Sequence, residues 1–122
     1  MAFRFLNFPV YKDAKRFRKE VKQITKKFPP EERYVLTDQI LRAATSIVLN
    51  IAEGTDRGTD IDFARYLNNS LTSLNEVVSC LDVAVDEKYL SDEEYKNYLE
   101  IAEKLANQLT AFRKSLLDNP TK

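Results

Sequence analysis

The sequence predicts an all-α protein, an antiparallel up-down-up-down four-helix bundle that forms a single domain over residues 1–122. Three observations predict this fold. Apolar residues recur at three- and four-residue spacing in four long segments, as they do in amphipathic helices. The two glycines and four prolines fall between these segments or at their ends, so the connections are short and neighbouring helices run antiparallel. No segment shows the sustained alternation of a strand.

The first helix is expected from about Pro9 to Phe28 and the second from about residue 31 to residue 53. Proline suits a first helical turn, because its missing N–H has no partner there. Pro29-Pro30 is expected to stop the first helix and start the second. Glu31-Glu32 then lies in the first turn, where negative charge suits the helix dipole. Gly54 is expected to supply the C-cap.

The third helix is expected over residues 59–88, with Thr59 as its N-cap. The fourth helix opens at Ser91, and the run Ser91-Asp92-Glu93-Glu94 has the pattern of a capping box. In that motif the serine oxygen accepts from the backbone of the glutamate, whose side chain reaches back to the serine N–H. Residues 118–120, Asp-Asn-Pro, are expected to end the helix.

The composition argues against most catalytic chemistry. There is no histidine, which is the commonest general base and metal ligand, and Cys80 is the only cysteine. We therefore expect a protein that is not an enzyme, with no catalytic residues, no metal and no cofactor. A lone cysteine also favours a cytoplasmic setting over secretion. The N-terminal run has no unbroken apolar core of a signal peptide, and no segment is apolar enough for a membrane span.

Charge is strongly segregated in a chain whose net charge is zero. Residues 1–57 carry a net of +5 and residues 58–122 a net of −5. Six cations are expected on the solvent face of the first helix, where they suit contact with the phosphates of RNA or DNA. The alternatives are a solvated helix face and a salt-bridge surface between subunits. The six residues are Lys12, Lys15, Arg16, Lys19, Lys22 and Lys26.

A polar stripe runs along the otherwise apolar second helix and continues beyond Gly54. One interpretation is a ligand-binding groove, and the other is a hydrogen-bond network between helices or subunits that sets the bundle register. Arg42 and Arg57 are expected to pair with Glu53 and Glu76. The stripe and its expected partner are Gln39, Arg42, Ser46, Asn50, Glu53, Arg57 and Glu76.

The central part of the chain resembles a known family. The stretch QILRAATSIVLNIAEGTDR, residues 39–57, is similar to the four-helix-bundle family of proteins encoded in intervening sequences of large-subunit ribosomal RNA genes. The resemblance covers about residues 8–112. The matching residues are Tyr11, Ala14, Phe28, Pro29 and Glu32, then Gln39, Arg42, Ala43, Ala44, Ser46, Ile47, Asn50, Ile51, Ala52, Glu53, Gly54 and Arg57, then Phe63, Arg65, Tyr66, Leu67, Ser73, Leu74 and Glu76.

The chain departs from the family pattern after the third helix, where Lys88 replaces a glycine that usually precedes an aromatic residue. The resemblance implies a homo-oligomer, commonly a pentamer. A related group, the accessory variability-determinant proteins of diversity-generating retroelements, binds nucleic acid and a reverse transcriptase. The resemblance thus adds an assembly mode and a possible class of partner to what the residues predict.

Three functional hypotheses follow. The first is an oligomeric scaffold that binds RNA or DNA backbone non-specifically through the basic face of the first helix. The second is a protein-binding adaptor without nucleic-acid activity, in which basic and acidic faces meet in the oligomer. The third is an enzyme built on Arg42, Asn50, Glu53 and Arg57, which would require these side chains to line an open cleft.

Overall fold

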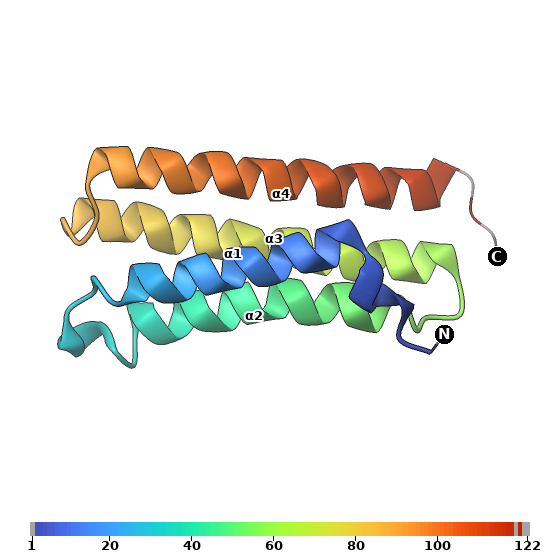
Figure 1. Ribbon diagram of the computed structural model, residues 1–122, viewed down its shortest axis with the longest axis horizontal. Helices are drawn as coiled ribbons and strands as arrows, with labels where there is room; N and C mark the ends of the chain where they lie inside the picture. The colour runs from blue at the N-terminus through green and yellow to red at the C-terminus, as the bar shows by residue number, and fades with distance from the viewer. Residues whose placement is uncertain (1, 119, 121–122) are drawn as a thin grey trace.

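The computed structural model describes residues 2–118 and residue 120, and these form the expected four-helix bundle (Figure 1). The helices lie side by side along the long axis of the molecule, and the N-terminal segment and the end of α4 lie at the same end. Two short 3₁₀ turns accompany them. The elements are η1 (Arg4–Asn7), α1 (Pro9–Thr25), η2 (Pro30–Glu32), α2 (Leu36–Gly54), α3 (Asp60–Asp86) and α4 (Asp92–Asp118).

The four helices close into a ring of contacts in chain order, α1 on α2, α2 on α3, α3 on α4 and α4 back on α1. Each helix turns its apolar stripe to a shared core, whose burial is the main stabilising contribution. The helices share this core unequally. Ten residues of α3 are buried, two of them serines, whereas in α4 only Ala102, Leu105 and Leu109 are buried. α4 is therefore the least embedded helix of the bundle.

The expected start of the second helix is wrong by about five residues. Pro30 begins the 3₁₀ turn η2, which contains Glu31 and Glu32, and α2 starts only at Leu36. Val35 has backbone angles of φ −118° and ψ −93°, outside the helical region, so the two elements are not continuous. The carboxylate of Glu32 does not lie at the start of α2 but accepts a 2.9 Å hydrogen bond from the hydroxyl of Tyr89.

Gly54 ends α2, but as a packing residue rather than a C-cap. No glycine of the described chain has a positive φ, and the C-cap position is Thr55 in right-handed geometry. A Cβ built on Gly54 would lie 2.6 Å from a ring carbon of Phe63, which is buried in α3. The missing side chain therefore lets the end of α2 approach the start of α3 closely.

Both expected helix N-caps are confirmed. The Thr59 hydroxyl accepts a 3.1 Å hydrogen bond from the Asp62 backbone at the start of α3. At α4, the Glu94 N–H donates to the Ser91 hydroxyl at 3.1 Å, and the Ser91 N–H donates to the Glu94 carboxylate at 2.9 Å. This reciprocal pair is the capping box that the sequence indicates.

Lys88 stands where the family usually has a glycine, and its backbone adopts the geometry that a glycine favours. Lys88 has φ 66°, in the left-handed region, directly after α3. The Lys88 N–H donates to the Val85 carbonyl and the Tyr89 N–H donates to the Ala84 carbonyl, both at 2.9 Å. This is the hydrogen-bond pattern of a Schellman C-cap. The turn before α4 therefore forms despite the side chain at Lys88.

None of the described helices is both long and apolar enough to span a bilayer.

Candidate nucleic-acid interface

Five lysines form a row along the outer surface of α1, four of them within the helix and Lys26 at its C-cap. Their spacing of three, four, three and four residues keeps them within about 80° of one another around the helix axis. From first to last they extend about 21 Å along the helix. All are exposed. This lysine row consists of Lys12, Lys15, Lys19, Lys22 and Lys26.

The positive charge of the lysine row is not balanced by ion pairs with the part of the chain that the structure describes. Among the residues that the structure describes, no carboxylate lies within ion-pair distance of any of the five ammonium groups. Arg16 differs, because its guanidinium pairs with Asp13 one turn earlier. The lysine row is thus the part of the expected six-residue face whose charge is available to an anionic partner.

A hollow of about 680 Å³ lies between α1 and α2, and Lys12, Lys15 and Lys19 of the lysine row border it. One wall consists of α1 cations, and the other consists of Thr45, Val48 and Leu49. Arg18 is fixed in this hollow, because its Nε–H donates a 2.8 Å hydrogen bond to the Thr45 hydroxyl. Leu49 is 54% exposed and adds an apolar surface beside the cations. We call this hollow the α1–α2 groove.

The aromatic residues near the row are not free for base stacking. Phe17 is buried at 2% exposure. Tyr11 is half-buried, with the Lys15 ammonium 5.1 Å from its ring centre and the Phe5 ring against it in an edge-on arrangement. The planar groups in the α1–α2 groove are therefore the guanidinium groups of Arg16 and Arg18, of which Arg18 is held in place by Thr45.

The polar stripe of α2 meets matching polar residues of α3. Gln39 donates to the Glu76 carboxylate at 2.8 Å, and the Ser73 hydroxyl donates to the Ser46 hydroxyl at 2.8 Å. The Asn50 amide donates to the Ser46 carbonyl and hydroxyl at 2.9 and 3.0 Å. A longer contact of 3.5 Å joins Asn69 to Asn50. We call these six residues, Gln39, Ser46, Asn50, Asn69, Ser73 and Glu76, the α2–α3 polar seam.

The charged members of the stripe take other partners than expected. Arg42 pairs with Asp38 one turn earlier at 3.0 Å, and not with Glu53 or Glu76. Arg57 donates to the Tyr66 hydroxyl at 3.2 Å and lies 5.0 Å from the centre of that ring. Within the described chain Glu53 has no ion-pair partner. Arg42 thus pairs within its own helix, and Arg57, which lies in the connection after α2, reaches a tyrosine of α3.

Three of the four residues of the enzyme hypothesis do line a hollow. Arg42, Asn50 and Glu53 border an open depression of about 540 Å³ on α2, whereas Arg57 is not part of its lining. The hydroxyls in this depression accept hydrogen bonds, Ser46 from Asn50 and Ser73, and Thr45 from the Arg18 guanidinium. No described hydroxyl there is hydrogen-bonded to a group that could take its proton.

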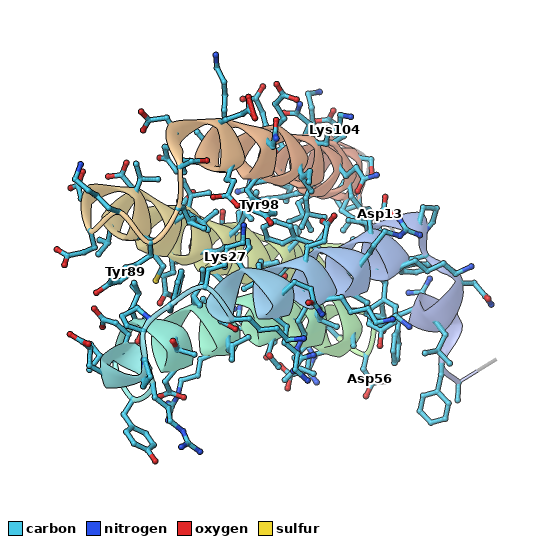
Figure 2. The ribbon with its side chains drawn as sticks, turned by 60° about the vertical axis from the view of Figure 1, so that its left-hand side comes forward. Asp13, Lys27, Asp56, Tyr89, Tyr98 and Lys104 are labelled. Atoms are coloured by element: carbon cyan, nitrogen blue, oxygen red, sulfur yellow. The ribbon has the colours of Figure 1, made fainter. Side chains whose placement is uncertain are left out.

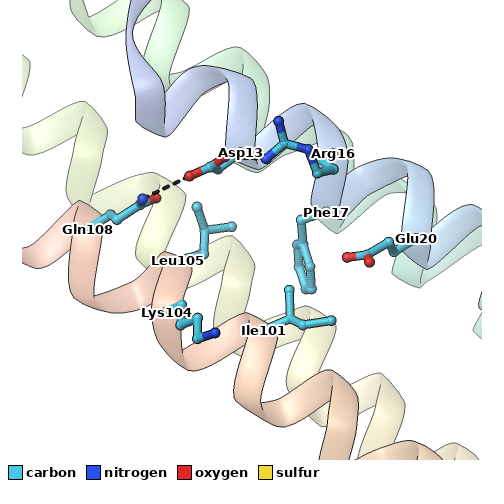
Figure 3. A pocket seen from close by; sticks show the side chains of 8 residues that line it. All are labelled: Asp13, Arg16, Phe17, Glu20, Ile101, Lys104, Leu105 and Gln108. Carbon is cyan, nitrogen blue, oxygen red and sulfur yellow. Dashed lines mark hydrogen bonds and ion pairs between the residues drawn. The ribbon is translucent and has the colours of Figure 1, made fainter.

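A second pocket, of about 220 Å³, lies between α1 and α4 (Figure 3). Its floor is apolar, and its charged side chains come from both helices. Asp13 accepts a 2.8 Å hydrogen bond from Gln108 across the pocket and is also the ion-pair partner of Arg16. The other amide atom of Gln108, Oε1, is buried without a hydrogen-bond partner. The contact of α1 with α4, where this pocket lies, is less extensive than the contact of α1 with α2.

The remaining candidates offer no reactive centre. Across residues 2–118 and residue 120, no group of three or more ligating side chains could hold a metal ion. Burial, with a smaller contribution from Glu76, raises the pKa of the Cys80 thiol and so disfavours the nucleophilic thiolate.

Sequence patterns alone did not reveal several residues of these surfaces. Arg18 and Thr45 face each other across α1 and α2, and Leu49 lies beside them as an exposed apolar residue. Ser70 is fully buried and donates a 2.9 Å hydrogen bond to the Ile47 carbonyl. The position of Arg18 could have indicated its role. It lies one helical turn after the core residue Ala14 and therefore at the edge of the apolar face.

These features define a small all-helical bundle in which α1 carries a row of exposed lysines and a polar seam joins α2 to α3. The chain belongs to the 23S rRNA-intervening sequence protein family, whose sequence model matches residues 7–111. A solved structure of a protein of unknown function, from the S23 ribosomal protein family of Bacteroides thetaiotaomicron, is similar to this chain. The two are 26% identical with a TM-score of 0.77, and the similarity covers 86% of this chain and 98% of the other. Among curated proteins, none matches the chain.

Proposed function

We propose that this protein is a non-enzymatic, homo-oligomeric scaffold that binds the phosphate backbone of RNA or DNA through the lysine row of α1. The observation that supports this most directly is the uncompensated charge of the row. Five exposed ammonium groups in line, with no described carboxylate in ion-pair distance, favour an external polyanion. Lysine also suits backbone contact without base readout, so binding is non-specific.

Assembly into a homo-oligomer, a pentamer by family resemblance, is part of the proposal. Several copies would present several lysine rows to one nucleic acid and so raise the apparent affinity without new contacts. The proposal assumes the cytoplasmic setting that the composition predicts, where ribosomal RNA and its processing fragments occur.

The proposal is tested by native mass from multi-angle light scattering, with and without a short single-stranded RNA at low salt. An oligomer that gains the mass of RNA supports the scaffold. Charge reversal at Lys15, Lys19 and Lys22 to glutamate should then abolish most of the gain. A matched control reverses three exposed lysines of α4, Lys96, Lys104 and Lys114, and so changes the net charge equally. Equal loss of binding in both variants would show that net charge, and not the row, holds the RNA.

The adaptor alternative is supported by the acidic C-terminal part of the chain, which could meet the lysine row of a neighbouring copy. It predicts no RNA mass and an oligomer that dissociates as salt rises. The same light-scattering experiment, repeated at low and high salt without RNA, therefore separates the two functions.

A further inference from the structure

Resting on the proposed function, we propose that the nucleic acid bound by this protein is single-stranded, and that it lies along the α1–α2 groove. Its phosphates would follow the lysine row, and its bases would turn toward Leu49 and the guanidinium of Arg18. The ligand chemistry is that of an unpaired strand, either RNA or DNA. Three features of the groove carry this inference.

The first feature is that the cations form one row and not two. The outward charges on α2 are Asp38, Arg42 and Glu53, and Arg42 is already paired with Asp38. A duplex presents two phosphate backbones, of which the second would meet the α2 side with its two carboxylates. A single strand needs only the lysine row and keeps its backbone away from these acids.

The second feature is the shape of the row. Neighbouring lysines are separated by rises of about 4.5 and 6 Å along a straight helix. A flexible strand can adjust its phosphates to such a line. A short duplex is effectively rigid, since DNA has a persistence length of about 150 base pairs, and its phosphates wind away from a straight row. Fewer lysines can therefore reach a duplex at once than can reach a single strand.

The third feature is the apolar surface in the groove. Leu49 is 54% exposed and lies with Val48 and Thr45 opposite the cations. Paired bases in a duplex are stacked on each other and cannot contact this surface. Unpaired bases expose their faces and gain by covering an apolar side chain. The groove thus offers a favourable contact that only an unpaired strand can use.

Arg18 supplies the planar partner that the aromatic residues do not. Its Nε–H is held by the Thr45 hydroxyl at 2.8 Å, and the side chain is half-buried in the groove. A guanidinium fixed in this way presents a flat face on which a base can stack, while its other N–H groups remain as donors to phosphate or base oxygens.

The test compares fluorescence anisotropy of labelled oligonucleotides of equal length at low salt, as single strands and as duplexes, in both RNA and DNA. We expect the protein to bind single strands about tenfold more tightly than duplexes. Leu49→Asn and Arg18→Lys should each weaken single-strand binding about fivefold and leave duplex binding unchanged. Arg18→Lys keeps the charge, so its salt dependence should equal that of the unmodified protein. The control is Val83→Asn, which alters an exposed aliphatic residue on α3.

The outcomes separate this inference from the proposed function. Equal affinity for single strands and duplexes, with Leu49→Asn and Arg18→Lys behaving like Val83→Asn, overturns the single-strand inference and leaves backbone binding intact. No binding of any oligonucleotide overturns both. Thermal unfolding by circular dichroism checks that each variant folds. If Leu49→Asn were unfolded, the charge-conserving Arg18→Lys would still decide the question.

Discussion

The two polar surfaces of this bundle differ in what their side chains contact. In the α2–α3 polar seam, side chains from the two helices are hydrogen-bonded to one another, as in the pairs Gln39 with Glu76 and Ser46 with Ser73. In the lysine row, no described carboxylate is within ion-pair distance of an ammonium group. The seam therefore stabilises the fold, whereas we propose that the charge of the row binds a partner.

The largest effect on stability is expected where α2 and α3 approach most closely. Gly54→Ala should lower the free energy of unfolding by about 2 kcal/mol, because the new methyl group would lie 2.6 Å from Phe63. The buried ring packs against Phe112 with centroids 5.2 Å apart and cannot move aside freely. Chemical denaturation measures the loss. Gly58→Ala is the control, since a Cβ there meets nothing within 4 Å. Equal stability of the two variants would contradict close packing at Gly54.

A smaller effect is expected within the seam itself. Ser46→Ala, Ser73→Ala and the double variant form a cycle, and the coupling between the two hydroxyls should be about 1 kcal/mol in favour of folding. Denaturation midpoints at constant slope measure it. The 2.8 Å hydrogen bond between these groups is the basis of the expectation. Purely additive effects would show that the seam does not contribute to helix pairing as a unit.

The lysine row should behave in the opposite way. Lys19→Gln and Lys22→Gln together should change the free energy of unfolding by no more than about 0.5 kcal/mol, because exposed residues without partners contribute little to the fold. The same pair of substitutions should weaken binding of single-stranded RNA. Thermal melts and anisotropy titrations on one preparation measure both. A marked loss of stability would mean that the row is part of the fold and not a surface kept for a partner.

The smallest effect concerns a contact at the end of the bundle, where Tyr89 meets the α1–α2 connection (Figure 2). The hydrogen bond to Glu32 raises the pKa of Tyr89 to about 12. A tyrosine in the unfolded chain titrates at about pH 10. The contact therefore stabilises the fold fully below that pH, and this stabilisation is lost as the pH rises to about 12. Tyrosinate absorbance during an alkaline titration should show a late group that Tyr89→Phe removes, while Tyr95, whose pKa burial and the hydrogen bond to Asp82 also raise, stays in both proteins. Uniform titration of the tyrosines would contradict the contact.

The sequence predicted the fold because local signals agreed along the chain. The apolar periodicity predicted the four helices. The capping patterns correctly predicted the N-caps at Thr59 and at Ser91 with Glu94. The start of α2 was missed, since the Glu31-Glu32 pair suits a helix start but lies in a 3₁₀ turn instead. A local pattern does not show that Glu32 bonds to a tyrosine far along the chain.

The candidate sites were less predictable for a related reason. The residue types and spacing of the lysine row follow from the sequence, but the absence of carboxylate partners depends on which faces of neighbouring helices turn toward it. Arg18 with Thr45, and Ser46 with Ser73, are pairs from different helices, each 27 residues apart. Their contact depends on the rotation of each helix about its axis, which one sequence does not specify. Arg42 pairs with Asp38 because that residue lies one turn earlier on the same helix, whereas Glu53 lies about three turns further along α2.

The central claim, that the lysine row holds a nucleic-acid backbone, is tested most directly by the salt dependence of RNA binding. For a single strand held by four or five lysines, the logarithm of the binding constant should fall with the logarithm of salt concentration with a slope of about −3. In the variant with Lys15, Lys19 and Lys22 changed to glutamate, weaker binding and a slope shallower by about 2 are expected. The variant with the three α4 lysines reversed should keep the original slope. Binding whose slope is the same in all three proteins would contradict the account.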